Sequence, residues 1–157
     1  MGALDVGKLV ELGAAGEAVG EHRRALAGAV RTLAELLSTT EGWQAPDLSG
    51  VTGVAQPHCH QHAVLGWDAD AALLSDAGAA ISAVGGCCGL AGNFGVERGH
   101  YEVSVAVAET ALLPAVRKAG EKATVLADGF SCRTQLDQLA GIPGTHLAEL
   151  LASRLDQ

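Results

Sequence analysis

Residues 79–89, Ala79-Ala80-Ile81-Ser82-Ala83-Val84-Gly85-Gly86-Cys87-Cys88-Gly89, carry the clearest structural signal in this chain. The first six residues form a short apolar run that is typical of a buried strand, and the glycine pair ends it. Similar runs occur at 51–56 and 123–127, and helix-like segments at 68–77 and 104–118 separate the three runs. Because a parallel strand connection needs about a dozen residues or more, usually as a helix, this alternation predicts an α/β fold with a small parallel sheet and flanking helices.

Two further regions extend the prediction towards the chain ends. Residues 134–139 and 146–155 are expected to form two closing helices. Residues 21–37 are expected to form one amphipathic helix, whose stripe either packs on the domain or docks a partner. The apolar residues of that stripe are Leu26, Val30, Leu33, Leu36 and Leu37. We therefore expect a helical amino-terminal extension over residues 1–48 and one domain over residues 49–157.

Composition and charge exclude several classes of function. The 157 residues are 48% hydrophobic but only 3% aromatic, so one compact core must be built from Ala, Val and Leu. The formal net charge of -8 and the lack of a basic run longer than Arg23-Arg24 argue against nucleic-acid binding. No apolar run approaches the roughly 20 residues of a transmembrane helix, and Asp5 and Glu11 are unlike a signal peptide. We expect a cytoplasmic protein without a transmembrane segment.

The four cysteines follow the expected strands. Cys59 comes after the first strand, Cys87 and Cys88 after the second, and Cys132 after the third. Ligands of open α/β sheets bind at the carboxyl ends of the strands, so three loops are expected to bring four thiols to one edge. In a reducing cytoplasm, metal binding or thiol chemistry explains such cysteines better than disulfides do.

Four thiolates suit either an iron–sulfur cluster or a tetrahedral zinc ion. Structural zinc sites usually use two short C-x2-4-C pairs, whereas here only Cys87 and Cys88 are close in sequence. The glycines around this pair allow backbone N–H groups to approach the sulfurs, which tunes a cluster's potential. The spacing favours an iron–sulfur cluster, and zinc or unligated cysteines remain alternatives.

Four motifs carry a family resemblance. They are His58-Cys59-His60-Gln61, Gly86-Cys87-Cys88-Gly89-Leu90-Ala91-Gly92-Asn93-Phe94-Gly95, Asp128-Gly129-Phe130-Ser131-Cys132-Arg133 and His146-Leu147-Ala148-Glu149-Leu150-Leu151. In this order they resemble the carboxy-terminal cysteine-rich (CCG) domain of FAD-linked oxidases, which include D-lactate and D-2-hydroxyglutarate dehydrogenase-like proteins. Related cysteine-rich domains occur in heterodisulfide reductase and anaerobic glycerol-3-phosphate dehydrogenase. The resemblance extends from about Val30 to Leu151.

The resemblance implies a 4Fe-4S cluster held by Cys59, Cys87, Cys88 and Cys132. In the family, a flavin domain oxidises a 2-hydroxy acid and the iron–sulfur part passes the electrons onward. FAD would therefore belong to a partner domain or subunit, and the isolated chain is not expected to be catalytic. The resemblance does not identify the electron acceptor.

The chain departs from the family pattern in two respects. The fuller motif closes with C-x-x-C, but Gly129 stands in the place of its first cysteine, which leaves four sulfur ligands. In addition, no flavin-binding domain, C-x2-C-x2-C run or G-x-G-x-x-G motif precedes the domain. By resemblance, the chain is expected to be a fragment or a separately encoded subunit.

Several neighbouring residues have more than one possible role. His58 and His60, with His62, either lie on an extended backbone as a ligand set or begin a helix and bond to cluster sulfurs or carbonyls; plain packing is the third possibility. Arg133 either neutralises a negative cluster or is a surface arginine. The aromatic residues Phe94 and Phe130 are expected to shield the site from water. The competing function is a zinc-stabilised or metal-free module that helps to assemble an oxidoreductase.

Overall fold

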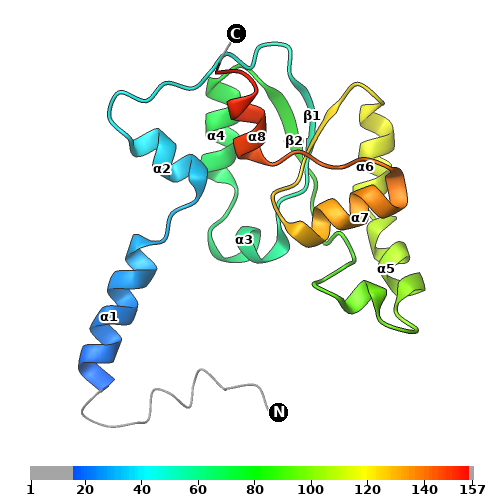
Figure 1. The fold of residues 1–157 in the computed structure, drawn as a ribbon, viewed down its shortest axis with the longest axis horizontal. Helices are drawn as coiled ribbons and strands as arrows, with labels where there is room; N and C mark the ends of the chain where they lie inside the picture. Colours follow the sequence, from blue (N-terminus) through cyan, green and yellow to red (C-terminus); the bar gives the residue numbers. More distant parts are fainter. Residues whose placement is uncertain (1–15, 156–157) are drawn as a thin grey trace. The chain divides into compact units, whose positions relative to one another are not determined.

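The structure divides into two compact units between Thr32 and Leu33. The computed structural model describes residues 16–155 (Figure 1). The second unit begins well before the expected boundary at residue 48, because Ala34 and Leu48 are both fully buried in its core. Helix α2, Leu33–Thr39, therefore belongs to the same unit as the sheet.

The expected single helix over residues 21–37 is wrong. Helix α1, Gly16–Ala29, ends before α2 begins at Leu33. Arg31 Nη1 donates to the carbonyl oxygens of Gly28, at 2.5 Å, and Val30, at 2.8 Å, and such arginine contacts satisfy backbone acceptors where a helix ends. The break divides the apolar stripe between the two units.

Three short parallel strands form the sheet, in the order β2-β1-β3. They are β1 (Thr52–Ala55), β2 (Ala80–Ala83) and β3 (Thr124–Leu126), close to the three expected runs. In the register, Val54 of β1 lies opposite Ser82 of β2 and Val125 of β3. The predicted α/β class with a small parallel sheet and flanking helices is therefore confirmed.

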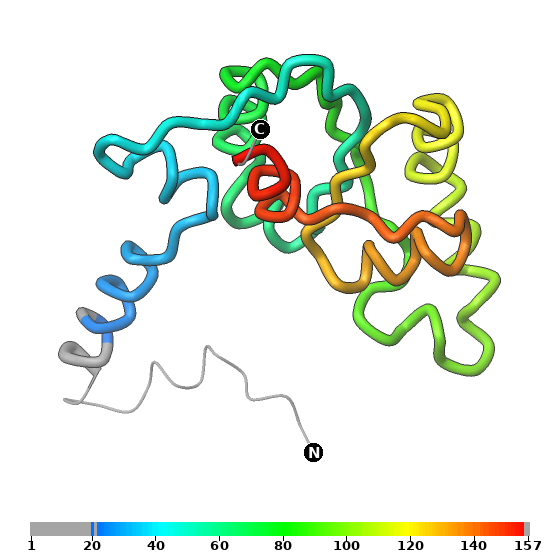
Figure 2. Tube along the Cα trace, turned by 45° about the horizontal axis from the view of Figure 1, so that its top comes forward, coloured from blue at the N-terminus to red at the C-terminus, as the bar shows by residue number. Residues whose placement is uncertain are grey.

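Helices cover both faces of the sheet. Helices α4 (Asp68–Asp76) and α8 (Leu147–Ala152) lie on one side of the strands, and α6 (Leu112–Ala119) and α7 (Phe130–Ala140) lie on the other, as Figure 2 also shows. Strand side chains alternate between the faces, so Leu126 contributes to one core and Val125 to the other.

The two faces have different cores. We call the first the aliphatic core, whose buried members are Ala34, Leu48, Val51, Ala55, Leu73, Leu74, Ala77, Leu126, Leu147, Leu150 and Leu151. We call the second the thiol core, whose buried members are Cys88, Leu90, Leu112, Val116, Val125, Ala127, Cys132 and Leu136. Two of the four cysteines are thus core residues of the α6 and α7 face.

The expected helix over residues 104–118 is also two helices, α5 (Tyr101–Ala108) and α6. Pro114 explains the break, because its ring clashes with the carbonyl four residues earlier but fits the first turn of a new helix. Arg117 donates to both carboxylate oxygens of Glu109 across the break, at 3.0 and 2.5 Å.

Among residues 16–155, no helix has the length and apolar character needed to cross a membrane.

Candidate cysteine site

Each cysteine lies directly beyond the carboxyl end of a strand. Cys59 is the first residue of α3 (Cys59–Val64), which follows β1. Cys87 and Cys88 lie in the loop after β2, and Cys132 lies in the first turn of α7 after β3. Because the three strands are parallel neighbours, these loops leave the sheet at the same edge.

The four thiols interact with one another. Cys88 and Cys132 share a side-chain hydrogen bond, and so do Cys59 and Cys87. Cys132 also interacts electrostatically with Cys59 and Cys87. The structure therefore brings together all four cysteines that the sequence singles out.

The four cysteine side chains differ in their exposure to solvent. Cys88 and Cys132 are 4% and 2% exposed, Cys87 is partly buried, and Cys59 is exposed. All four are free thiols. One side of the site is therefore formed by the thiol core, while Cys59 lies at the protein surface.

The buried pair is electrostatically polarised. The pKa of Cys88 is lowered to about 6, first by the hydrogen bond from Cys132 and further by the N–H groups of Leu90 and Ala91, against the effect of burial. The same bond to Cys88, followed by burial, raises the pKa of Cys132. The pair therefore favours ionisation of Cys88 over ionisation of Cys132, with the Cys132 thiol as the hydrogen-bond donor.

Cys87 differs from Cys88. Burial raises the pKa of the Cys87 thiol, while the N–H of Gly89, 3.3 Å from its sulfur, opposes this rise. The adjacent thiols therefore differ in their readiness to ionise, because Cys88 has the Cys132 thiol as an additional donor.

The backbone after the cysteine pair takes an unusual conformation. Gly89 has φ 94°, and a Cβ there would lie 2.2 Å from the carbonyl oxygen of Ser104, so no other residue fits. Ala91 has φ 46° and is the only non-glycine residue with positive φ among residues 16–155. This strained turn includes the two N–H groups that bond to Cys88, and successive N–H groups of this kind form anion-binding concavities.

Side chains that the sequence analysis did not single out brace the loops. Gln56, which is 2% exposed, donates from Nε2 to the carbonyl of Gly86 at 3.1 Å and so joins the first loop to the second. Ser131 Oγ accepts from the N–H of Gly92 at 3.2 Å and joins the second loop to α7. A glutamine at the end of a buried strand was the available signal for the first brace.

The histidines occupy different positions. His60 and His62 are exposed and lie within α3, so the backbone here is helical and not extended as the first alternative requires. His58 is the partly buried N-cap of α3. A Cβ at Gly129 would lie 2.4 Å from Cδ2 of His58, so the imidazole packs directly on the Gly129 backbone.

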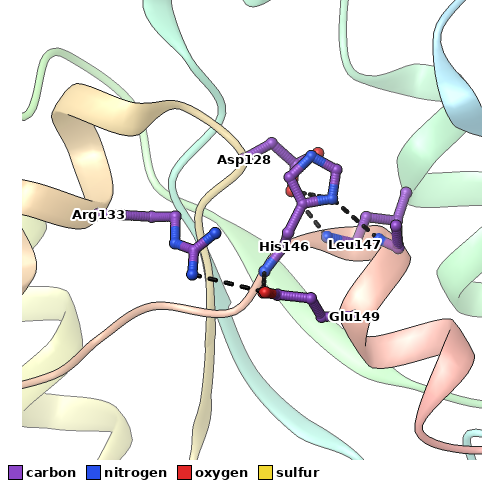
Figure 3. A network of polar contacts seen from close by, with 6 residues as sticks. Asp128, Arg133, His146, Leu147 and Glu149 are labelled. Atoms are coloured by element: carbon purple, nitrogen blue, oxygen red, sulfur yellow. Dashed lines mark hydrogen bonds and ion pairs between the residues drawn. The ribbon is translucent and has the colours of Figure 1, made fainter.

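Arg133 pairs with Glu149 of α8, with 3.6 Å between Nη2 and Oε1 (Figure 3). In the same network, Asp128 Oδ1 accepts from the N–H of Leu147 at 2.8 Å. Arg133 therefore has an acidic partner on α8, outside the cysteine loops, and Asp128 fastens the start of α8 to the loop that leads into α7.

His146 begins the last helix, as expected. Its Nδ1 accepts from the N–H of Ala148 at 3.0 Å, and Glu149 Oε2 accepts from the N–H of His146 at 2.8 Å, which completes a capping box. Asp128 Oδ1 lies 3.8 Å from the same Nδ1. Because this nitrogen accepts the capping bond, its contact with Asp128 is not an ion pair in that tautomer.

The aromatic residues do not both shield the site. Phe130 is 84% exposed, which contradicts its expected role. Phe94 is 37% exposed and stacks on His100, with ring centroids 4.2 Å apart. Phe130 instead places an apolar side chain on the surface two residues before Cys132.

The arrangement of the four thiols can be compared with the two groups that the sequence suggests, a zinc ion and an iron–sulfur cluster. Within the described part of the chain, no three His, Cys, Asp or Glu side chains converge on a point that could hold one metal ion. A zinc ion needs sulfurs about 2.3 Å from a common centre, whereas an iron–sulfur cluster is a larger body with thiolates around it. Four thiols, two of them accepting backbone N–H bonds, match such a cluster in ligand chemistry.

No family model, curated protein or solved structure matches this chain.

Proposed function

We propose that the chain is an iron–sulfur electron-transfer domain of an FAD-linked 2-hydroxy-acid oxidoreductase, in which Cys59, Cys87, Cys88 and Cys132 hold a 4Fe-4S cluster. The observation that carries the proposal is the meeting of four free thiols from three strand-end loops at one edge of the sheet. The order of the four motifs and the resemblance to the CCG domain support the same assignment.

Different residues of the chain would contribute to binding such a cluster and to setting its potential. The pKa of Cys88 is lowered by the Cys132 hydrogen bond and by the N–H groups of Leu90 and Ala91, which favours the thiolate form that a metal ligand needs. Thiolate ligands bind metal only when deprotonated, so this pair of donors favours loading. A bound cluster would supply reversible one-electron transfer, while the thiol core would exclude water on the side of Cys88 and Cys132 and the N–H donors would raise the potential.

The partner in this proposal is an FAD-binding oxidase domain or subunit that oxidises the substrate. The exposed thiol of Cys59 and the exposed ring of Phe130 lie at the starts of α3 and α7, where contact with such a partner would bring the centres close. Four free thiols support placement in the reducing cytoplasm. The chain alone is proposed to bind no FAD and to oxidise no 2-hydroxy acid.

Anaerobic reconstitution with iron and sulfide tests the assignment. We expect a brown protein with about four irons and four sulfides per chain and broad visible absorbance that dithionite bleaches. Cys88→Ser should lose most of the iron, whereas Ser38→Ala, an exposed change on α2, should keep it. Full iron and sulfide content in the double variant Cys87→Ser/Cys88→Ser would contradict the proposal.

The alternative is a zinc-stabilised or metal-free assembly module. The specific observation in its favour is the Cys88–Cys132 hydrogen bond, because the two thiols already satisfy each other within the thiol core. Metal analysis after expression separates the two functions. One zinc per chain, or no metal with an unchanged melting temperature, would favour the alternative.

A further inference from the structure

We propose that Cys59 and Cys87, which we call the outer pair, form a reversible disulfide when the protein without a cluster meets a hydroperoxide, while Cys88 and Cys132 stay reduced. The disulfide would withdraw two of the four proposed ligands and so control loading of the site, and this consequence rests on the proposed function. Disulfides of the reducing cytoplasm are usually transient and redox-sensing ones.

The register of the sheet places the outer pair in matching positions. Ala55 of β1 is paired with Ala83 of β2. Cys59 and Cys87 each follow their member of this pair by four residues, in segments that leave the sheet at the same edge. The N–H of Val84 donates to the carbonyl oxygen of Ala55 at 2.7 Å, so the two segments begin as neighbours.

A buried side chain ties the two segments together beyond the strands. Gln56 Nε2 donates to the carbonyl oxygen of Gly86 at 3.1 Å. Gln56 lies three residues before Cys59, and Gly86 lies directly before Cys87. The thiols of Cys59 and Cys87 then share a side-chain hydrogen bond. The two sulfurs are therefore already within reach of each other.

The other cysteines are poorer partners for Cys87. Cys88 is adjacent to it in sequence, and consecutive Cα atoms lie about 3.8 Å apart, whereas the Cα atoms of a disulfide usually lie about 4.4–6.8 Å apart. Cys132 shares its hydrogen bond with Cys88 instead. Cys59 is therefore the partner that fits a bond to Cys87.

Exposure to solvent selects the outer pair for reaction. Cys59 is exposed and Cys87 is partly buried, whereas Cys88 and Cys132 are 4% and 2% exposed. A dissolved oxidant reacts with thiols that it can reach, most readily where a second thiol lies beside the first. A hydroperoxide therefore meets Cys59 first, with Cys87 in place to complete the disulfide.

The reaction has two steps and consumes one hydroperoxide. The Cys59 sulfur attacks the peroxide, so that the O–O bond breaks, an S–O bond forms, and a sulfenic acid and water result from hydrogen peroxide. The Cys87 sulfur then forms the S–S bond and displaces the hydroxyl group, which leaves as water with the Cys87 proton. Two thiols are oxidised and the peroxide is reduced to water. A dithiol reductant restores both thiols by exchange.

Peptide mapping of the full chain tests the pairing. Reduced, chelator-treated protein is exposed to one equivalent of hydrogen peroxide, alkylated and cleaved before aspartate, which places Cys59, the Cys87-Cys88 pair and Cys132 on three different peptides. We expect the free thiols per chain to fall from four to two. Fragmentation should show one cross-link, between Cys59 and Cys87. A link through Cys88 or Cys132, or no link, overturns the inference.

Two matched double variants separate the pairs. Cys88→Ser/Cys132→Ser keeps the outer pair and should lose both remaining thiols to peroxide, and dithiothreitol should restore them. Cys59→Ser/Cys87→Ser keeps the buried pair and should react about tenfold more slowly or less. Equal rates in the two variants would contradict selection by exposure. Gln56→Leu keeps all four cysteines and should slow cross-linking, so it covers the case in which a double variant fails to fold.

Failure of this inference and failure of the proposed function give different results. Protein carrying the disulfide should lose most of its iron and sulfide uptake and recover it after reduction with dithiothreitol. Loading of the reduced protein without a Cys59–Cys87 link after peroxide overturns the inference alone. The same link in a protein whose reduced form takes up no iron overturns the proposed function alone.

Discussion

The two faces of the sheet are covered by cores of different composition. The aliphatic core, under α4 and α8, consists of leucine, alanine and valine side chains. The thiol core, under α6 and α7, contains Cys88 and Cys132 among its buried members. The buried members of the first core are all aliphatic, whereas in the second core the candidate ligands are themselves core residues.

This difference predicts that binding of the proposed cluster is coupled to folding on one face only. A thiol in the core is a small apolar group without metal and a charged ligand with it. Loss of a bound group would leave the Cys88 sulfur with only the Cys132 thiol and the N–H groups of Leu90 and Ala91 as partners. The aliphatic core has no comparable dependence.

The largest expected effect follows removal of iron from the reconstituted protein with a chelator under anaerobic conditions. We expect hydrogen-exchange protection in α7 and residues 85–92 to fall by more than about 4 kcal/mol, because binding free energy at such a site is also folding free energy. Protection in α4 and α8 should change much less. Equal loss on both faces would show that the two cores unfold as one unit.

Matched leucine truncations sharpen the comparison. Leu74 of the aliphatic core is 2% exposed and Leu136 of the thiol core is 0% exposed. Each change to alanine should lower the free energy of unfolding by about 3 kcal/mol, measured by urea denaturation. Only Leu136→Ala should also reduce iron bound per chain, and reduced iron in Leu74→Ala would contradict the separation.

Asp70 of α4 is a buried acidic residue, unlike the members of the aliphatic core. It is 2% exposed, and burial first, then the nearby Asp128, raises the pKa of its carboxyl from 3.8 to about 6. The pKa of the Asp70 carboxyl is higher in the folded state than in the unfolded state. Its contribution to the free energy of unfolding is therefore most favourable below about pH 4 and is lost as the pH rises through about 6. Asp70→Asn should therefore raise the free energy of unfolding at pH 8 by about 2 kcal/mol.

The control for this prediction is the pH dependence itself. The gain from Asp70→Asn should shrink towards zero at pH 4, where the native carboxyl is protonated. Urea denaturation at both pH values measures it. A gain that is the same at pH 4 and pH 8 would assign the effect to packing.

The smallest expected effect concerns the cap of α8. His146→Ala removes the acceptor for the Ala148 N–H and should lower the free energy of unfolding by about 1 kcal/mol. His146→Asn keeps a capping side chain and should recover most of this loss. Thermal denaturation of both variants measures the difference, and an equal loss in both would show that the imidazole does more than cap.

The sequence was sufficient for the sheet and for the placement of the cysteines. The expected strands at 51–56, 79–84 and 123–127 contain the observed strands, because short apolar runs between turn residues carry a local signal. Because neighbouring parallel strands end at the same edge of a sheet, the sequence also predicted that the segments carrying the cysteines meet there.

What the sequence did not predict depends on contacts between distant segments. Helix breaks at residues 30–32 and 109–111 interrupt periodic stripes that looked continuous. The bracing bonds of Gln56 and Ser131, and the packing of His58 on Gly129, join different loops and leave no periodic pattern. The cluster, the flavin partner and the cytoplasmic location stay predictions.

The distribution of the thiols over the segments that follow the three strands also orders events during synthesis of the chain. Parallel strands pair only after their long connections close, so the edge that gathers the cysteines is complete only when β3 has joined β1. At about 5–20 residues per second, a ribosome adds Cys132 a few seconds after Cys88. During that interval Cys59, Cys87 and Cys88 are present on a nascent chain without their fourth member, and oxidants have access to them that the folded protein denies to the buried pair.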